Sequence, residues 1–185
     1  MSLKERSIAF IGAGHITEMI VSRLTKMDHT DPERLIAADP VREKLEKLRE
    51  QHGISTAKDN LEAVNAADFV FVNVMPNIVR EVVEEFKAAG FPGGKAIISV
   101  AGGIPIAAYD ELGGQLAIVR ALPNPPSQVG KGIAALAFNP HVTEDQKKYI
   151  LELFACLGDH VVVREEFVNA VMALSSPAIT YMFFL

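Results

Sequence analysis

The feature that most constrains this chain is a short apolar run that ends in a glycine turn and continues into an amphipathic segment. Residues 7–11 are largely apolar, residues 12–17 read Gly-Ala-Gly-His-Ile-Thr, and apolar side chains then recur at helical spacing over 19–24. This order predicts a strand, a tight turn and a helix. Gly12 lets the chain turn, and Gly14 leaves the backbone open to a pyrophosphate, which a helix N-terminus attracts.

The turn departs from the dinucleotide-binding fingerprint at its third position. Thr17 stands where the fingerprint has Gly or Ala, so we expect slightly wider packing between helix and strand. A plain strand-to-helix turn is the alternative interpretation. The position of the motif between a strand and a helix near the N-terminus favours dinucleotide binding.

Further strands and helices alternate along the rest of the chain. The pattern predicts strands over 34–38, 68–74, 95–100, 115–122, 131–138 and 160–163, and helices over 41–51, 78–86, 143–157 and 165–174. Thr143 and Gln146 have the spacing of a capping box. This alternation predicts an α/β fold of the Rossmann type, a doubly wound and mostly parallel sheet with right-handed crossovers.

Asp39 follows the second predicted strand, about 20 residues after the glycine turn, where such folds place the carboxylate that binds the adenosine ribose. Its charge would repel a 2′-phosphate, which predicts a preference for NADH over NADPH. The alternative is that Asp39 and Pro40 only form a turn and cap the next helix, and both roles are compatible. Arg42, one turn further on, could still accommodate a phosphate.

Composition excludes several other classes of function. Eighteen Lys and Arg against 23 Asp and Glu give a net charge of −5 with scattered basic residues, which argues against nucleic acid as a partner. The sequence has neither a membrane-spanning apolar stretch nor a secretory signal at its start, so we expect no membrane and a cytoplasmic location. The five histidines do not share metal-ligand spacing, and Cys156 is expected to be a small core residue.

Five segments of the chain stand out by their order and spacing. They are Ile8–Thr17, Val74-Met75-Pro76, residues 99–103 (Ser-Val-Ala-Gly-Gly), Arg120–Pro126 (Arg-Ala-Leu-Pro-Asn-Pro-Pro) and Asn169–Tyr181. In this order and spacing they resemble the pyrroline-5-carboxylate reductase family. The segment Arg120–Pro126 is the most specific of them, and the resemblance runs from residue 7 to the end of the chain.

The resemblance implies that a nicotinamide cofactor reduces the cyclic imine of pyrroline-5-carboxylate to proline. It implies a dinucleotide-binding domain over residues 1–163 and, over 164–185, the start of a helical dimerisation domain whose remainder is absent. The implied cofactor-binding residues are Gly12, Gly14, His15, Ile16 and Thr17 at the pyrophosphate, Asp39 and Asn60 at the adenosine ribose, and Val74, Met75, Pro76, Ala101 and Gly102 at the nicotinamide. Asn60 could instead cap the following helix, and Asn124 could hold a rigid loop rather than contact a ligand.

The tail predicts a partner subunit. Residues 177–185 are almost wholly apolar, and a helix without a polar face must be buried. We expect either a truncated chain or a segment that packs on another subunit of a homodimer or larger homo-oligomer.

The chain also departs from the family pattern. Met75 replaces the usual Lys, Asp39 replaces a usual Ser or basic residue, and the serine-rich segment near 173–178 lacks its glycine. No residue is assigned as the catalytic proton donor. Two alternatives therefore stay open: another NAD(P)-dependent dehydrogenase of related fold, and a short non-catalytic homologue that binds a dinucleotide and a partner protein.

Overall fold

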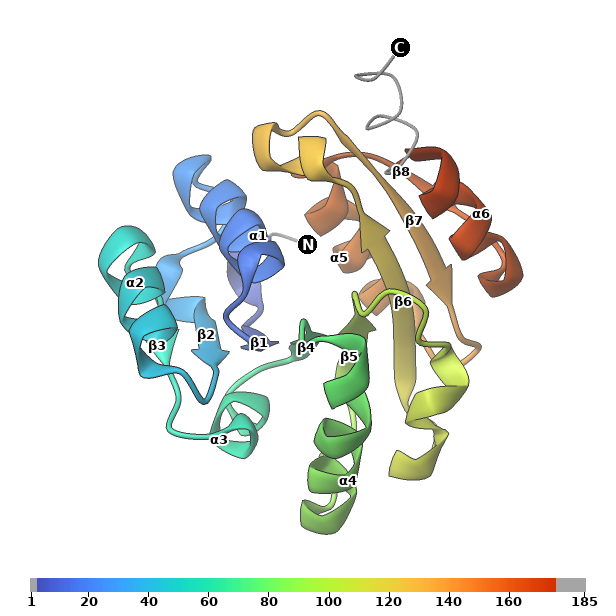
Figure 1. Cartoon of the computed structure of the whole chain (residues 1–185), viewed down its shortest axis with the longest axis horizontal. Coiled ribbons are helices and arrows are strands. Elements are labelled where there is room, and N and C mark those ends of the chain that lie inside the picture. Colours follow the sequence, from blue (N-terminus) through green and yellow to red (C-terminus); the bar gives the residue numbers. More distant parts are fainter. Residues whose placement is uncertain (1–2, 176–185) are drawn as a thin grey trace.

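The alternation of strands and helices organises the whole computed structural model, which describes residues 3–175 (Figure 1). Eight strands form one sheet in the order β3-β2-β1-β4-β5-β6-β7-β8. The strands are β1 (Ile8–Ile11), β2 (Leu35–Ala38), β3 (Ser55–Thr56), β4 (Phe69–Val72), β5 (Ala96–Ser99), β6 (Ala117–Pro123), β7 (Gly132–Phe138) and β8 (Gly158–Val162). The predicted doubly wound, mostly parallel α/β sheet is confirmed.

Helices cover both faces of the sheet. They are α1 (His15–Lys26), α2 (Arg42–His52), α3 (Asn60–Asn65), α4 (Val79–Ala89), α5 (Glu144–Ala155) and α6 (Glu165–Ser175). Figure 1 shows α1 and α2 together near one end of the sheet and α6 beside β7 near the other end. The capping box predicted for α5 is present, because Thr143 Oγ1 accepts from the backbone N–H of Gln146 and the Gln146 side chain accepts from Thr143 N–H.

Successive side chains of a strand point to opposite faces, which divides the core into two layers. Phe10 and Phe71 lie in the layer covered by α1, α2 and α5, where their ring centroids are 5.2 Å apart. Ile11 and Val72, one position further along the same strands, lie in the layer covered by α3, α4 and the 3₁₀ helix Ile106–Leu112. The central strands are buried on both faces, as the continuous apolar sequences of 68–74 and 95–100 predicted for β4 and β5.

The alternation fails between β6 and β7, which pair antiparallel. Their connection contains only the short 3₁₀ helix Pro125–Val129. A parallel return requires a crossover of about a dozen residues or more, so this short link turns the chain back on itself. The strand β3 is also an addition to the predicted elements, and it is too short to leave a clear period in the sequence. The six-residue helix α3 is the helix expected at Asn60.

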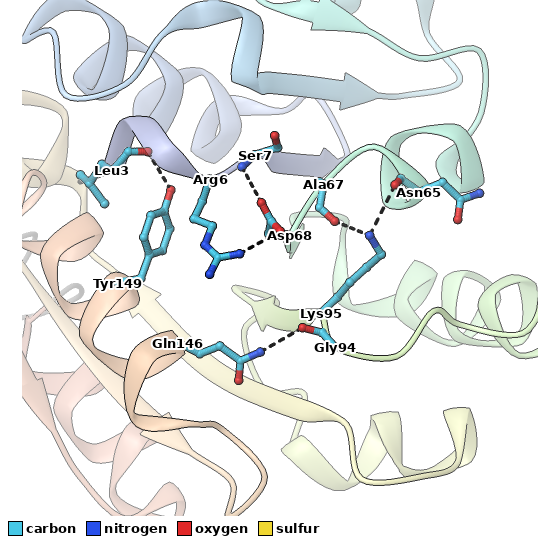
Figure 2. A network of polar contacts seen from close by, with 10 residues as sticks. All are labelled: Leu3, Arg6, Ser7, Asn65, Ala67, Asp68, Gly94, Lys95, Gln146 and Tyr149. Carbon is cyan, nitrogen blue, oxygen red and sulfur yellow. Dashed lines mark hydrogen bonds and ion pairs between the residues drawn. The ribbon is translucent and has the colours of Figure 1, made fainter. Parts of the chain in front are cut away.

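The amino ends of the central strands are joined by polar side chains, as Figure 2 shows. Asp68, just before β4, accepts from the backbone N–H of Ser7 at 3.0 Å and from the guanidinium of Arg6 at 3.3 Å. Lys95 donates to the carbonyl of Ala67, and the Tyr149 hydroxyl donates to Leu3 O at 3.2 Å. These bonds tie β1, β4, β5 and α5 together and leave the opposite, carboxyl edge of the sheet for ligands.

Candidate functional site

A cavity of about 850 Å³ opens at the carboxyl ends of β1, β2, β4 and β5. Binding sites of open α/β sheets lie at this edge, where the strand order reverses. The cavity brings together all but one of the predicted cofactor residues: Gly12, Gly14, His15, Ile16, Asp39, Asn60, Val74, Met75, Pro76, Ala101 and Gly102. The missing one is Thr17.

Gly12 and Gly14 have different roles in the turn. Gly12 has φ of +99°, donates its N–H to Ala38 O at 2.8 Å, and would place a Cβ 2.8 Å from Asn73 O. Only glycine fits there without strain. Gly14 is the N-cap of α1, and among the described residues other than Gly14 and its two chain neighbours no atom lies within 4 Å of the position of a Cβ on it. The backbone is therefore open to a ligand at Gly14, next to the N–H groups at the start of α1.

Thr17 stabilises the glycine turn through hydrogen bonds of its buried side chain. It is fully buried, its hydroxyl donates to Gly12 O at 2.5 Å, and the same oxygen accepts from Asn73 Nδ2 at 2.9 Å. A glycine or alanine here could not make these bonds. The departure from the fingerprint thus connects the glycine turn to the end of β4, whereas the motif predicts Thr17 at the pyrophosphate.

Asp39 accepts hydrogen bonds from the backbone of the glycine turn and from the residue that precedes α2. Its Oδ2 accepts from the N–H of Ala13 at 2.8 Å, and its Oδ1 accepts from the N–H of Val41 at 2.9 Å. Lys44 Nζ lies 3.5 Å from Oδ2. Asp39 therefore forms the turn before α2, as one of the two interpretations predicted, but the N-cap of α2 is Val41, so the capping role predicted for Asp39 is wrong. Asp39 also lines the cavity. Lys44 lines the cavity as well, whereas Arg42, the cation singled out from the sequence, is absent from its lining.

Asn60 lines the cavity and is held by α4. Its Nδ2 donates to Glu85 Oε2 at 2.7 Å. The cap of α3 is Asp59, whose Oδ1 accepts from Glu62 N–H at 2.8 Å, so the interpretation of Asn60 as a cap is wrong. Glu85 was missed from the sequence because it lies on the polar side of a helix, a pattern shared by solvated glutamates.

The other half of the cavity is formed by the loops after β4 and β5. Val74, Met75 and Pro76 follow β4, and Ala101 and Gly102 follow β5. Met75 is 69% exposed, so its flexible thioether lies at the surface of the cavity. The mostly apolar loops after β4 and β5 suit a planar ring, and the N–H groups at the start of α1 suit a negatively charged group of the same ligand.

The segment Arg120–Pro126, the most specific of the five segments, forms hydrogen bonds that connect α6 to the sheet. Arg120, on β6, is 4% exposed and donates from Nη2 to Asn169 Oδ1 at 2.7 Å. Asn124 is equally buried, donates to the carbonyl of Ser175 at 3.0 Å and accepts from Ile133 N–H at 2.8 Å. The middle and the carboxyl end of α6 are thus held by this segment, so the structure supports the interpretation of Asn124 as a residue that holds a loop.

Other candidate chemistry is not supported in the described part of the chain. Among residues 3–175, no group of three His, Cys, Asp or Glu side chains could hold a metal ion. Cys156 is buried, and burial raises the pKa of its thiol, which fits a core residue rather than a nucleophile. No helix in residues 3–175 is long and apolar enough to cross a membrane. The apolar tail 177–185 lies outside the described residues.

Comparison with known proteins agrees with this geometry. Residues 7–103 match the family model described as NADP oxidoreductase coenzyme F420-dependent. The solved pyrroline-5-carboxylate reductase of Coxiella burnetii is 32% identical, with a TM-score of 0.90, and the alignment covers 97% of this chain and 67% of that one. The chain belongs to the pyrroline-5-carboxylate reductase family.

Two further members of the pyrroline-5-carboxylate reductase family show the same extent of similarity. The Vibrio alginolyticus enzyme is 34% identical over 183 residues, which are 98% of this chain and 66% of the relative. The Plasmodium falciparum enzyme, solved with NADP bound, is 24% identical with a TM-score of 0.85 and shares the fold over 97% of this chain and 66% of that chain. The chain thus spans about two thirds of the length of these reductases and contains their NAD(P)-binding domain.

Proposed function

We propose that this chain is the cofactor-binding part of an enzyme that reduces 1-pyrroline-5-carboxylate to L-proline with NAD(P)H, a step of proline biosynthesis. The observation that best supports the proposal is the carboxyl-edge cavity, in which the glycine turn, the end of β2 and the loops after β4 and β5 meet. The family membership supplies the substrate class, a cyclic imine carboxylate.

The residues of the cavity suit a dinucleotide in three parts. The N–H groups at the start of α1, with His15 and Ile16 beside them, would bind the pyrophosphate. Asp39 and Asn60 offer acceptors and a donor to the adenosine ribose. The nicotinamide ring, which supplies the hydride when bound, would be held and shielded by the loops after β4 and β5, that is by Val74, Met75, Pro76, Ala101 and Gly102. Orientation and exclusion of water are what these residues contribute to the reaction.

We propose that NADH is preferred over NADPH because Asp39 lies where a 2′-phosphate would approach. Two like charges about 4 Å apart at an effective dielectric of about 20 repel by about 4 kcal/mol, and Lys44 and solvent reduce that figure. A preference of roughly tenfold follows. The Asp39→Ser variant should bind NADH more weakly and NADPH more tightly. Tighter binding of NADPH than of NADH by the wild-type chain would contradict this assignment.

We further propose that residues 164–185 begin a second, helical domain that associates with another copy in a cytoplasmic homodimer or larger homo-oligomer. The boundary at 163 falls between β8 and α6. Because the chain spans about two thirds of the length of the related reductases, the 185 residues alone should bind cofactor and reduce the imine poorly or not at all.

A reductase assay tests the activity. The gene product that contains this chain is mixed with pyrroline-5-carboxylate and either NADH or NADPH, and nicotinamide oxidation is followed next to the 185 residues alone. We expect turnover by the gene product and at least about a hundredfold less by the 185 residues, since binding without a complete site leaves most of the barrier in place. A gene product that binds NADH and leaves pyrroline-5-carboxylate unreduced would contradict the proposal.

A further inference from the structure

The carboxylate of Asp39 has three donors, and they differ in mobility. The N–H groups of Ala13 and Val41 belong to the backbone of the glycine turn and of the entry to α2, so their positions are fixed by the fold. Lys44 Nζ, the third, is 3.5 Å from Oδ2 at the end of a long side chain. The Asp39 side chain is 7% exposed and that of Lys44 is 48% exposed. Lys44 is therefore the donor that can leave.

The carboxylate of Asp39 can accept only a few further hydrogen bonds, so it matters whether Lys44 occupies one of these positions. A carboxylate has about four lone-pair positions, and the two backbone N–H groups use one on each oxygen. A ribose diol that binds Asp39 competes with Lys44 for what is left. A 2′-phosphate, by contrast, carries close to two negative charges and needs a cation at this position.

We propose that Lys44 determines cofactor selectivity at this site: it moves aside for the ribose hydroxyls of NADH, and it pairs with the 2′-phosphate of NADPH while neutralising Asp39. The inference rests on the proposed function, because it concerns the same cavity. It makes Lys44 the group that strengthens the binding of NADPH beside Asp39, and it makes Asp39 the reason that NADPH remains the weaker ligand.

The neighbouring charged groups do not offer the same arrangement. Lys58 lines the cavity, but its side chain is 77% exposed and its ammonium lies 4.0 Å from Asp59. Glu85 is engaged with Asn60. Lys47, one turn after Lys44 on α2, binds the carboxylate of Glu18 at 2.9 Å and is absent from the cavity lining.

The test is a pair of binding titrations, with NADH and with NADPH, followed by nicotinamide fluorescence on the 185-residue chain. Lys44→Met should raise the Kd for NADPH about tenfold or more and change that for NADH by less than about threefold, because one charge-assisted bond is lost with NADPH alone. Lys44→Arg should keep the ratio of the two constants within about threefold of wild type. Lys47→Met is the matched control and should leave both constants unchanged.

Added salt gives an independent measurement. The difference between wild type and Lys44→Met with NADPH should shrink as ionic strength rises, since the pairing is electrostatic and half exposed. Three results would overturn the inference: a ratio of the Kd values for NADPH and NADH that Lys44→Met leaves unchanged, an equal loss of affinity for both cofactors in Lys44→Met, or a change in Lys47→Met as large as that in Lys44→Met. In each case, binding of NADH by the wild-type chain would still support the cofactor site. Failure of the wild-type chain to bind either dinucleotide would overturn the proposed function and this inference together.

Discussion

Arg120 on β6 donates its Nη2 to Asn169 Oδ1 on α6 at 2.7 Å, across the seam where the last described helix meets the sheet. The guanidinium is almost fully buried, and the carboxylate of Glu165, at 3.7 Å, is too far for a good hydrogen bond. Asn169 is thus the main hydrogen-bonding partner of a buried charge.

Removing that partner should destabilise the chain. We expect Asn169→Ala to lower the free energy of unfolding by about 1–3 kcal/mol, because the buried guanidinium loses its acceptor. Asn169→Asp retains an acceptor and should be at least as stable as wild type. Urea unfolding measures both variants, and equal stability of Asn169→Ala and wild type would show that the bond contributes nothing.

Asn124 gives a prediction that separates a structural role from ligand binding. Asn124→Ala leaves Ile133 N–H and the Ser175 carbonyl without this partner and should cost about 2–3 kcal/mol, whereas Asn124→Asp keeps the acceptor for Ile133 and should cost less. Both variants should bind NADH with a Kd within about twofold of wild type, because Asn124 is absent from the cavity lining. A large loss of affinity in a variant that remains folded would identify Asn124 as a ligand-binding residue.

Gly12 should tolerate no side chain. Gly12→Ala forces a Cβ into a left-handed backbone position 2.8 Å from Asn73 O, and we expect a loss of about 2–4 kcal/mol in unfolding free energy. Gly14→Ala, two residues on and open to solvent, is the control and should change stability by less than about 1 kcal/mol. Thermal unfolding measures both variants. An equal loss of stability in Gly12→Ala and Gly14→Ala would contradict this prediction.

Tyr109 predicts how stability falls at alkaline pH. Burial raises the pKa of Tyr109 to about 12, and its hydroxyl donates to Ser99 Oγ at 2.8 Å. The stabilisation linked to this raised pKa is present in full below the ordinary value of about 10 and is lost as the pH rises toward 12, roughly 2–3 kcal/mol in all.

Comparison with Tyr109→Phe isolates this effect. The wild-type chain should be more stable than the variant by about 1 kcal/mol at pH 8, since it keeps the bond to Ser99, and the difference should shrink and then reverse as the pH approaches 12. Chemical unfolding at a series of pH values measures it. A difference that stays constant over that range would show that Tyr109 does not titrate with folding.

Sequence reasoning succeeded where a pattern has a single physical cause. The buried runs that became β1, β4 and β5, the capping box of α5 and the glycine turn were all predicted, because burial on both faces and a positive φ leave few alternatives. The antiparallel β7 was not predicted, because strand direction depends on the length of the connection, which the periodicity of 131–138 does not contain.

The site shows the same division. The glycines and Asp39 could be found because their positions follow from the fold's geometry, whereas Lys44 and Glu85 could not be distinguished from the other charged residues of their helices. Their relevance depends on which turn of α2 or α4 faces the cavity. Thr17 was predicted at the cofactor because it occupies the third position of the glycine motif, but its hydroxyl binds Gly12 O within the turn.

The most direct test of the central claim is a titration of the chain with NADH, followed by nicotinamide fluorescence, in wild type, Gly14→Val and Gly93→Val. Both glycines have open space around the position of a Cβ among the described residues, but only Gly14 lines the cavity. We predict that wild type and Gly93→Val bind NADH equally and that Gly14→Val, with unfolding free energy within about 1 kcal/mol of wild type, binds at least about a hundredfold more weakly. Equal binding by Gly14→Val, or no binding by wild type, would contradict the account.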